Sequence, residues 1–473
     1  MRYCAFKDGG KSMSEEKEEK KTGWEACDDA ERESIMKFAD GYIDFINTAK
    51  TEREAAKEIK RIADEHGFRD ISEADSLKPG DKVYYINHGK SVYMAVVGKA
   101  PVTDGFNAVG AHIDAPRLDL KQEPLYEDTG MAFLRTHYYG GIKKYQWTTV
   151  PLALHGVVSF SDGRTQEIRV GEEEGDPVFL VTDLLPHLAQ KQNARKLADA
   201  VEGEKLNILV GSMPDADAES DRVKAAVLKI LKDKYGMEEE DFTSAEIEAV
   251  PAAKARTLGL DGSMVAGYGQ DDRICAYPGL MSIIDIEGVP ERTVVGIFSD
   301  KEEIGSVGNT GMASHNFELF TMELLEKTGI VNPYAVQRTF SASRVLSADV
   351  TAAFDPGYPE VMEKQNAAFV GKGININKYT GARGKSGASD ANAEFIGFVR
   401  GVFDKAGVEY QFSELGKVDA GGGGTIAYIL ADRGMNVLDC GVPILSMHSP
   451  YEAASKYDIY QGYKAYKAFL EAE

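Results

Sequence analysis

Cysteine is scarce in this chain of 473 residues, which contains only Cys4, Cys27, Cys275 and Cys440. No two of them have the Cys-x-x-Cys spacing, so the sequence argues against a disulfide framework and against a thiolate zinc site. Sparse, unpaired cysteine is typical of proteins in a reducing compartment. We therefore expect the protein to be cytoplasmic.

Long apolar runs and basic residues are also lacking. No segment approaches the roughly 18 consecutive apolar residues of a membrane-spanning helix, and residues 1–21 lack the apolar core of a secretory signal. The 54 Lys and Arg against 76 Asp and Glu give a formal net charge of −22. Because phosphates and anionic lipids attract basic surfaces, neither nucleic acid nor a membrane is expected as a partner. An acidic chain does tolerate bound cations.

The length suggests two or three domains, because one simple core does not grow to this size. Residues 1–24 are highly charged and are predicted to form a flexible leader. Between residues 116 and 261, short strand patterns and turn signals surround one helical pattern at 218–235, which predicts an inserted, β-rich domain. The flanking segments, 25–115 and 262–473, are predicted to form one catalytic domain.

Hydrophobic periodicity predicts an α/β fold for the flanking segments. Apolar residues recur at helical spacing from about 28 to 65, and apolar runs at 106–112 and 294–298 are typical of buried strands. After residue 267, further strands alternate with helices. Such alternation indicates a mostly parallel sheet with helices on both faces.

Two adjacent glutamates, Glu302 and Glu303, follow the apolar run Thr293–Phe298. Open α/β sheets place their sites beyond the carboxyl ends of such strands. Because neighbouring carboxylates repel each other, a positive charge beside them is favoured, and a metal ion is the simplest one. In an extended chain the two side chains would face opposite ways. The alternative is a solvated acidic turn.

Two histidines, His112 and His448, share this context at the end of a predicted strand. His112 and Asp114 are two residues apart in an extended segment, so the carboxylate can hold the second ring nitrogen of a metal-bound imidazole. A capped histidine at a strand end is the alternative. The histidines of the inserted segment remain candidates to face a site across an interface: His137, His155 and His187.

Aspartates complete the set of candidate ligands. Asp271 and Asp272 follow a glycine-containing turn, which can place one carboxylate outward and one inward, and Asp349 follows a short apolar run. A carboxylate that bridges two ions is common in aminopeptidases, whereas a helix-capping aspartate is the alternative. Imidazoles and carboxylates together suit zinc, manganese or cobalt rather than iron–sulfur or copper.

Taken together, these short motifs resemble the aspartyl aminopeptidase family of dinuclear zinc metallopeptidases. The matching segments are His112–Pro116, Tyr139–Gly141, Gly269–Arg273, Asp300–Ser306, Ser347–Asp349 and Met447–His448. The resemblance extends from about residue 25 to the end of the chain. It implies a common α/β peptidase core and, at 116–261, an inserted β domain used for dimer contacts.

The resemblance also implies a role for each candidate residue. The implied metal ligands are His112 and Asp349 for one ion, Glu303 and His448 for the other, and Asp271 for both. Glu302 is implied to be the general base and acid, and Asp114 to orient His112. The implied cofactors are two divalent metal ions, zinc above all, with manganese or cobalt as alternatives.

The implied activity is the removal of N-terminal residues, acidic ones among them, from peptides with a free N-terminus. Self-association is also implied, as dimers that assemble into a dodecamer. The alternatives are a related metal-dependent amidase or deacylase and a catalytically inactive structural homologue.

The chain departs from the family pattern near the substrate. Ile113 and Ala115 stand where the family has Thr and Ser, and Gln146–Leu152 replaces a Trp-Phe-Asp-Arg-Asp-Leu stretch. The preference for acidic residues is therefore open, and Lys378 is a candidate partner for an acidic side chain. The glycine-rich run Asp419–Thr425 lacks the ending of a phosphate-binding loop, so we expect its backbone to approach the substrate or metal site.

Overall fold

The computed structural model describes residues 22–473, and residues 1–21 of the expected leader lie outside this part. The described chain begins with a short 3₁₀ turn, η1 (Gly23–Glu25). The backbone N–H of Gly23 donates to the carbonyl of Gly371 over 2.8 Å. The end of the expected leader thus contacts the C-terminal half of the chain.

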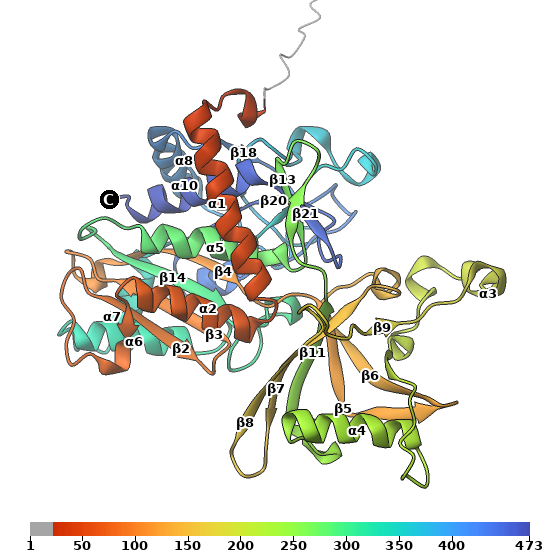
Figure 1. Cartoon of the computed structure of the whole chain (residues 1–473). Helices are drawn as coiled ribbons and strands as arrows, with labels where there is room; N and C mark the ends of the chain where they lie inside the picture. Colours follow the sequence, from red (N-terminus) through yellow and green to blue (C-terminus); the bar gives the residue numbers. More distant parts are fainter. Residues whose placement is uncertain (1–21) are drawn as a thin grey trace, which may run out of the picture.

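A nine-stranded sheet forms the centre of the larger part of the molecule (Figure 1). In spatial order its strands are β1 (Arg69–Asp70), β2 (Lys82–Asn87), β3 (Ser91–Val96), β14 (Thr293–Ser299), β4 (Phe106–His112), β15 (Arg344–Ser347), β19 (Asn436–Gly441), β17 (Ile374–Asn377) and β18 (Tyr410–Phe412). The central strands β14, β4, β15 and β19 run parallel, whereas β3 and β17 flank them in the antiparallel direction. The sheet is therefore mixed, and the mostly parallel arrangement expected from the sequence holds for its central strands.

Burial explains the continuous apolar runs of β4 and β14. Every residue of both strands is buried, as expected for parallel strands with helices on both faces. Alternate residues of β4 divide between two cores, with Val109 and Ala111 in one and Phe106 and Ala108 in the other.

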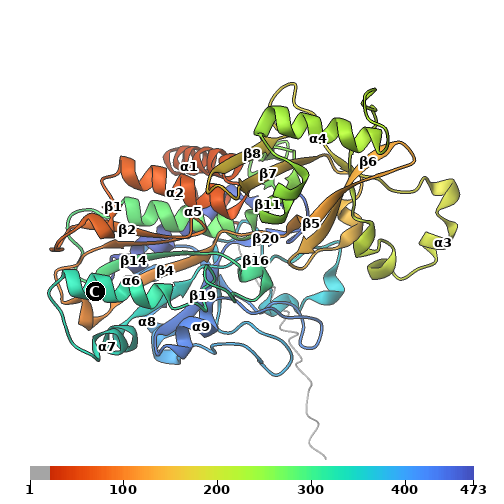
Figure 2. The same cartoon turned by 90° about the horizontal axis from the view of Figure 1, so that it is seen from below.

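Helices form a layer on each face of this sheet. One layer contains α1 (Asp29–Thr48), α2 (Glu52–Glu65), α5 (Gln270–Ile284), α8 (Ala393–Ala406) and α10 (Lys456–Leu470). The other contains α6 (Asn316–Lys327), α7 (Ala335–Ala342) and α9 (Ala427–Asp432). Figure 2 shows α1, α2 and α5 on one side of the sheet and α6 and α7 on the other.

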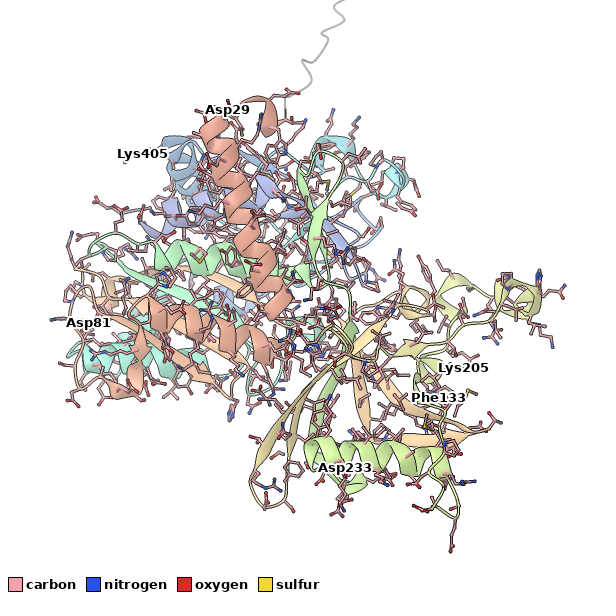
Figure 3. All side chains as sticks on the ribbon, viewed as in Figure 1. Asp29, Asp81, Phe133, Lys205, Asp233 and Lys405 are labelled. Carbon is pink, nitrogen blue, oxygen red and sulfur yellow. The ribbon has the colours of Figure 1, made fainter. Side chains whose placement is uncertain are left out.

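Charged residues lie on the outer faces of α1 and α8. Asp29 on α1 and Lys405 on α8 are exposed (Figure 3). The two amphipathic helices predicted between residues 28 and 65 are confirmed as α1 and α2. None of the helices described between residues 22 and 473 is both long and apolar enough to cross a membrane.

A second, seven-stranded sheet stands apart from the first (Figure 1). In spatial order its strands are β8 (Thr165–Val170), β7 (Leu152–Ser159), β11 (Ala245–Pro251), β5 (Arg117–Asp128), β6 (Met131–Tyr139), β10 (Ile208–Gly211) and β9 (Leu180–Val181). Neighbouring strands are antiparallel. The helix predicted at 218–235 is α4 (Arg222–Tyr235), which packs on β5, β6 and β10. The segment that carries α3 (Gln190–Asn193) extends away from this sheet.

A third, five-stranded sheet joins distant segments of the chain. Its strands are β12 (Arg256–Leu258), β13 (Met264–Gly267), β21 (Glu452–Ser455), β20 (Pro443–Leu445) and β16 (Thr351–Ala352). The strand expected before His448 is the short β20. His448 therefore approaches from a different sheet than His112.

Candidate metal centre

The candidate ligands meet at one edge of the central sheet. β4 ends at His112, β14 leads to a short 3₁₀ turn, η9 (Glu302–Ile304), and Asp349 follows β15. Because β4, β14 and β15 are parallel neighbours, their carboxyl ends lie at the same edge. A cavity of about 520 Å³ opens there. Its wall includes Asp271, Glu302, Glu303, Asp349 and His448.

Asp271 lies between the two histidines. His112 Nε2 is 3.1 Å from Asp271 Oδ1, and His448 Nε2 is 3.1 Å from Asp271 Oδ2. Although burial opposes its ionisation, hydrogen bonds from His112 and His448 lower the pKa of the Asp271 carboxyl. Asp271 thus presents one oxygen of an anionic carboxylate to each imidazole.

Two groups of candidate ligands share Asp271. One consists of His112, Asp271 and Asp349 and the other of Asp271, Glu303 and His448, and within each group the ligand atoms lie within 4.8 Å of one another. Oε1 of Glu303 is buried without a hydrogen-bond partner. Burial and neighbouring carboxylates raise the pKa of Glu303 and of Asp349. Since a cation relieves such crowding of buried carboxylates, the donor set fits divalent metal ions.

Asp114 holds the other ring nitrogen of His112. His112 Nδ1 lies 3.1 Å from the backbone oxygen of Asp114 and 3.3 Å from its Oδ1. The buried Asp114 carboxylate also accepts the backbone N–H groups of Glu302 and Glu303 over 3.1 and 3.3 Å. These hydrogen bonds hold the Asp114 carboxylate in place. Asp114 in turn holds Nδ1 of His112, so that His112 Nε2 faces Asp271.

The glutamate pair does not have the extended backbone expected from the sequence. Glu302 and Glu303 lie in η9, after Lys301 with a φ of 67°. The two carboxylates nevertheless approach different histidines. Glu302 Oε2 is 3.9 Å from His112 Nε2, and Glu303 Oε2 is 3.5 Å from His448 Nε2. Burial raises the pKa of Glu302 to about 7, so its carboxyl can accept and donate a proton near neutral pH.

The carboxylates of Asp271 and Asp272 have different surroundings, as the turn allows. Asp271 belongs to the wall of the cavity, whereas Asp272 does not. Asp271 is 3% exposed and Asp272 is 0% exposed. Asp272 Oδ2 accepts the backbone N–H of His112 over 3.2 Å. The second aspartate thus fixes the backbone of a candidate ligand instead of facing solvent.

Sequence reasoning missed Glu452, which supports the centre from β21. Its buried carboxylate accepts the backbone N–H groups of His448 and Asp271 over 2.8 and 3.2 Å. Burial raises the pKa of Glu452 to about 8. Its position four residues after His448 was the only signal in the sequence.

The histidines of the inserted segment are not among the described residues of this chain that line the cavity. His137 and His187 are exposed, and the buried His155 places Nδ1 2.8 Å from Glu54 Oε1. Lys378 is exposed and does not belong to the cavity wall. The glycine-rich run behaves as expected, because Gly422–Thr425 line the cavity.

Such a site suits an aminopeptidase as well as a related amidase or deacylase, and similarity to known proteins distinguishes between them. Residues 45–470 match the family described as Aminopeptidase I zinc metalloprotease (M18). The chain belongs to the M18 family. It is therefore a metallo-aminopeptidase, a hydrolase of peptide bonds, from a family of zinc enzymes. This confirms the resemblance inferred from the short motifs.

Relatives of this M18 aminopeptidase are similar over nearly their whole length. A protein of Clostridium acetobutylicum named Probable M18 family aminopeptidase 1 is 51% identical over 457 residues, 96% of this chain and 98% of the relative. The crystal structure of the Thermotoga maritima M18 aminopeptidase has a TM-score of 0.92 at 44% identity, covering 96% of this chain and 99% of that chain. Aminopeptidase I of C. acetobutylicum has a TM-score of 0.90 at 48% identity with the same coverage, 96% and 99%.

Proposed function

We propose that this M18 aminopeptidase works with two divalent metal ions, zinc in the first place and manganese or cobalt as alternatives. The proposed ligands are His112 and Asp349 for one ion, Glu303 and His448 for the other, and Asp271 for both. The observation that carries this assignment is the position of Asp271, whose two oxygens each lie 3.1 Å from one histidine. A carboxylate shared by two ligand groups suits a two-metal centre.

The proposed chemistry divides between the ions and the glutamate beside them. Two bound ions would polarise the scissile carbonyl and lower the pKa of the attacking water. Glu302 takes the proton of that water and passes it to the leaving amine. Because burial raises its pKa to about 7, Glu302 suits both steps. Asp114 holds Nδ1 of His112 and so sets the direction of the coordinating nitrogen.

The cavity wall favours a neutral N-terminal side chain over an acidic one. Its apolar members include Val350, Leu415 and Met447. Neither lysine nor arginine is among the described residues that line it, whereas the buried carboxylate of Asp439 is. An acidic side chain would therefore find no cationic side chain on the wall and would lie in the same cavity as the Asp439 carboxylate.

A panel of aminoacyl p-nitroanilides, assayed beside N-acylated amino acids, tests the proposed activity and this preference. We expect kcat/KM to be at least about tenfold higher for leucyl than for aspartyl or glutamyl substrates, and no cleavage of N-acylated compounds. Equal cleavage of acidic substrates would contradict the neutral preference. Cleavage of N-acylated compounds alone would favour the amidase or deacylase alternative. Absence of any hydrolysis with metal bound would favour an inactive homologue.

We also propose that residues 116–261 form a separate dimerisation domain and that 25–115 and 262–473 form the catalytic domain. Several large apolar side chains on the outer segment of the second sheet are exposed, which is typical of interaction surfaces. They are Leu184, Leu185, Leu188, Leu197 and Met213. The Saccharomyces cerevisiae mApe1 dodecamer shares the fold, with a TM-score of 0.73 at 19% identity. We propose dimers that assemble into such a dodecamer, in the cytoplasm.

Replacement of Leu188 by glutamate tests this assembly. Leu188 is 69% exposed, and a charge there would remain unpaired inside an apolar interface. Sedimentation velocity should show a large oligomer for the wild type and smaller species for Leu188→Glu. The control is Leu319→Glu, at a leucine of α6 that is 44% exposed, which should leave the oligomer intact. A monomeric wild type would contradict the proposed assembly.

A further inference from the structure

The end of strand β6 reaches from the second sheet into the candidate metal centre. β6 ends at Tyr139, and Gly140 and Gly141 follow it. Gly141 belongs to the wall of the cavity. A segment of the inserted region therefore contacts residues that come from the other two sheets.

Tyr139 fixes the carboxylate that holds His112. Its hydroxyl donates to Asp114 Oδ2 over 2.8 Å, and Asp114 is 0% exposed. The other oxygen of Asp114 lies 3.3 Å from His112 Nδ1. A tyrosine hydroxyl keeps its proton at neutral pH, so it is a steady donor to an ionised carboxylate. Rotation of the Asp114 carboxylate would break this hydrogen bond in a site that water does not reach.

Gly141 acts on the second histidine. Its carbonyl accepts a hydrogen bond from His448 Nδ1 over 2.8 Å. His448 Nε2 then faces Asp271 and Glu303, at 3.1 and 3.5 Å. A histidine that donates one ring N–H to a backbone carbonyl presents its other nitrogen as a ligand.

Glycine allows this close approach. Gly140 has a φ of 74°, in the left-handed region. A Cβ on Gly140 would lie 3.2 Å from Glu303 Oε2, and a Cβ on Gly141 would lie 3.4 Å from His448 Nδ1. The segment is therefore packed directly against one carboxylate and one imidazole of the proposed ligand set.

An ionic cluster holds the Tyr139 ring in place. The guanidinium carbon of Arg117 lies 3.8 Å from the ring centroid. Arg117 pairs with Asp119 and Glu248 of the second sheet, at 2.8 and 3.2 Å, and with Glu52 at the start of α2, at 3.3 Å. Arg117 is 6% exposed. Contacts from both parts of the molecule thus fix the position from which Tyr139 donates.

We propose that the segment Tyr139–Gly141 orients both metal-binding histidines, so that the inserted region is part of the catalytic centre. Tyr139 and Gly141 are positioning residues, Tyr139 through Asp114 and Gly141 through His448. This inference rests on the metal centre proposed above. It gives the inserted region a role that is independent of dimer contacts.

The variant Tyr139→Phe removes the hydroxyl alone. The zinc affinity, measured by competition with a chromophoric chelator, should fall about tenfold. This is the lower end of the loss seen when the direct partner of a ligand is removed, because Asp114 itself remains beside His112. The visible absorption spectrum of the cobalt-loaded protein should change. The unfolding midpoint of the metal-free protein should stay close to that of the wild type. If Tyr139 had only a structural role, this midpoint would fall. The matched control is Tyr138→Phe at the neighbouring tyrosine, which is 41% exposed.

The variant Gly140→Ala tests the contacts of the segment Tyr139–Gly141 with His448 and Glu303. It should lower zinc affinity by about tenfold, because Glu303 Oε2 lies only 3.2 Å from the added Cβ and must shift to make room for it. Gly130→Ala controls for backbone strain, since Gly130 has a φ of 75° and nothing within 4 Å of its added Cβ.

The outcomes separate this inference from the proposed metal centre. If Tyr139→Phe or Gly140→Ala binds zinc within about twofold of the wild type, or no more weakly than its control, the positioning role is overturned. If the wild type itself binds fewer than two ions, the proposed centre is wrong instead.

Discussion

Replacement of Glu302 by glutamine is expected to lower kcat by about 10²–10⁴-fold while both metal ions remain bound. Glu302 belongs to neither of the two ligand groups that share Asp271. Its Oε2 lies 3.9 Å from His112 Nε2, at the wall of the cavity. Glutamine has nearly the same shape but cannot take a proton from water. The loss should therefore appear in kcat with a neutral aminoacyl p-nitroanilide, while elemental analysis finds wild-type metal content.

The exposed Glu360 supplies a matched control for this experiment. Glu360→Gln makes the same change of charge on the surface and should keep wild-type turnover and metal content. If Glu302→Gln retains more than about a tenth of the wild-type kcat, the assignment of Glu302 as general base is wrong, because it requires a larger loss. If Glu302→Gln loses metal, Glu302 is a ligand instead.

The variant Asp271→Ala should lose both ions, whereas Glu303→Ala should lose one. Asp271 is the residue common to the two ligand groups, and each of its oxygens lies 3.1 Å from one histidine. Loss of a residue that hydrogen-bonds a metal ligand lowers metal affinity roughly 10–100-fold. Loss of a ligand that both ions share should lower it further. Elemental analysis after gel filtration should show almost no bound metal in Asp271→Ala. Turnover should be undetectable without added metal.

The number of ions lost distinguishes Asp271→Ala from Glu303→Ala, and a surface variant serves as the control. Asp432→Ala, at an exposed aspartate of α9, should bind metal as the wild type does. Circular dichroism of the metal-free proteins checks that each variant keeps its fold. Retention of one ion by Asp271→Ala would contradict its bridging role. Loss of both ions by Glu303→Ala would mean that the two ions bind as one cooperative unit.

Local patterns in the sequence predicted a large part of the centre. His112 and Asp349 follow buried apolar runs, and the carboxyl ends of neighbouring parallel strands meet at one edge. The structure brings both residues together with Asp271. Glu452 was missed because it acts on Asp271 across 181 residues of chain. Gly141 contacts His448 across 307 residues, and no periodicity in the sequence indicates such a contact.

By itself, the sequence indicated that His112 and Asp349 follow buried strands and that the segments at 28–65 and 218–235 are helical, because apolar periodicity is a property of neighbouring residues. Only the tertiary structure decided that Asp271 lies between the two histidines and that the glutamate pair occupies a 3₁₀ turn. It also decided that the sheet is mixed and that the end of β6 contacts the centre. These features depend on the order and direction of strands, which are set by the packing of segments far apart in the chain.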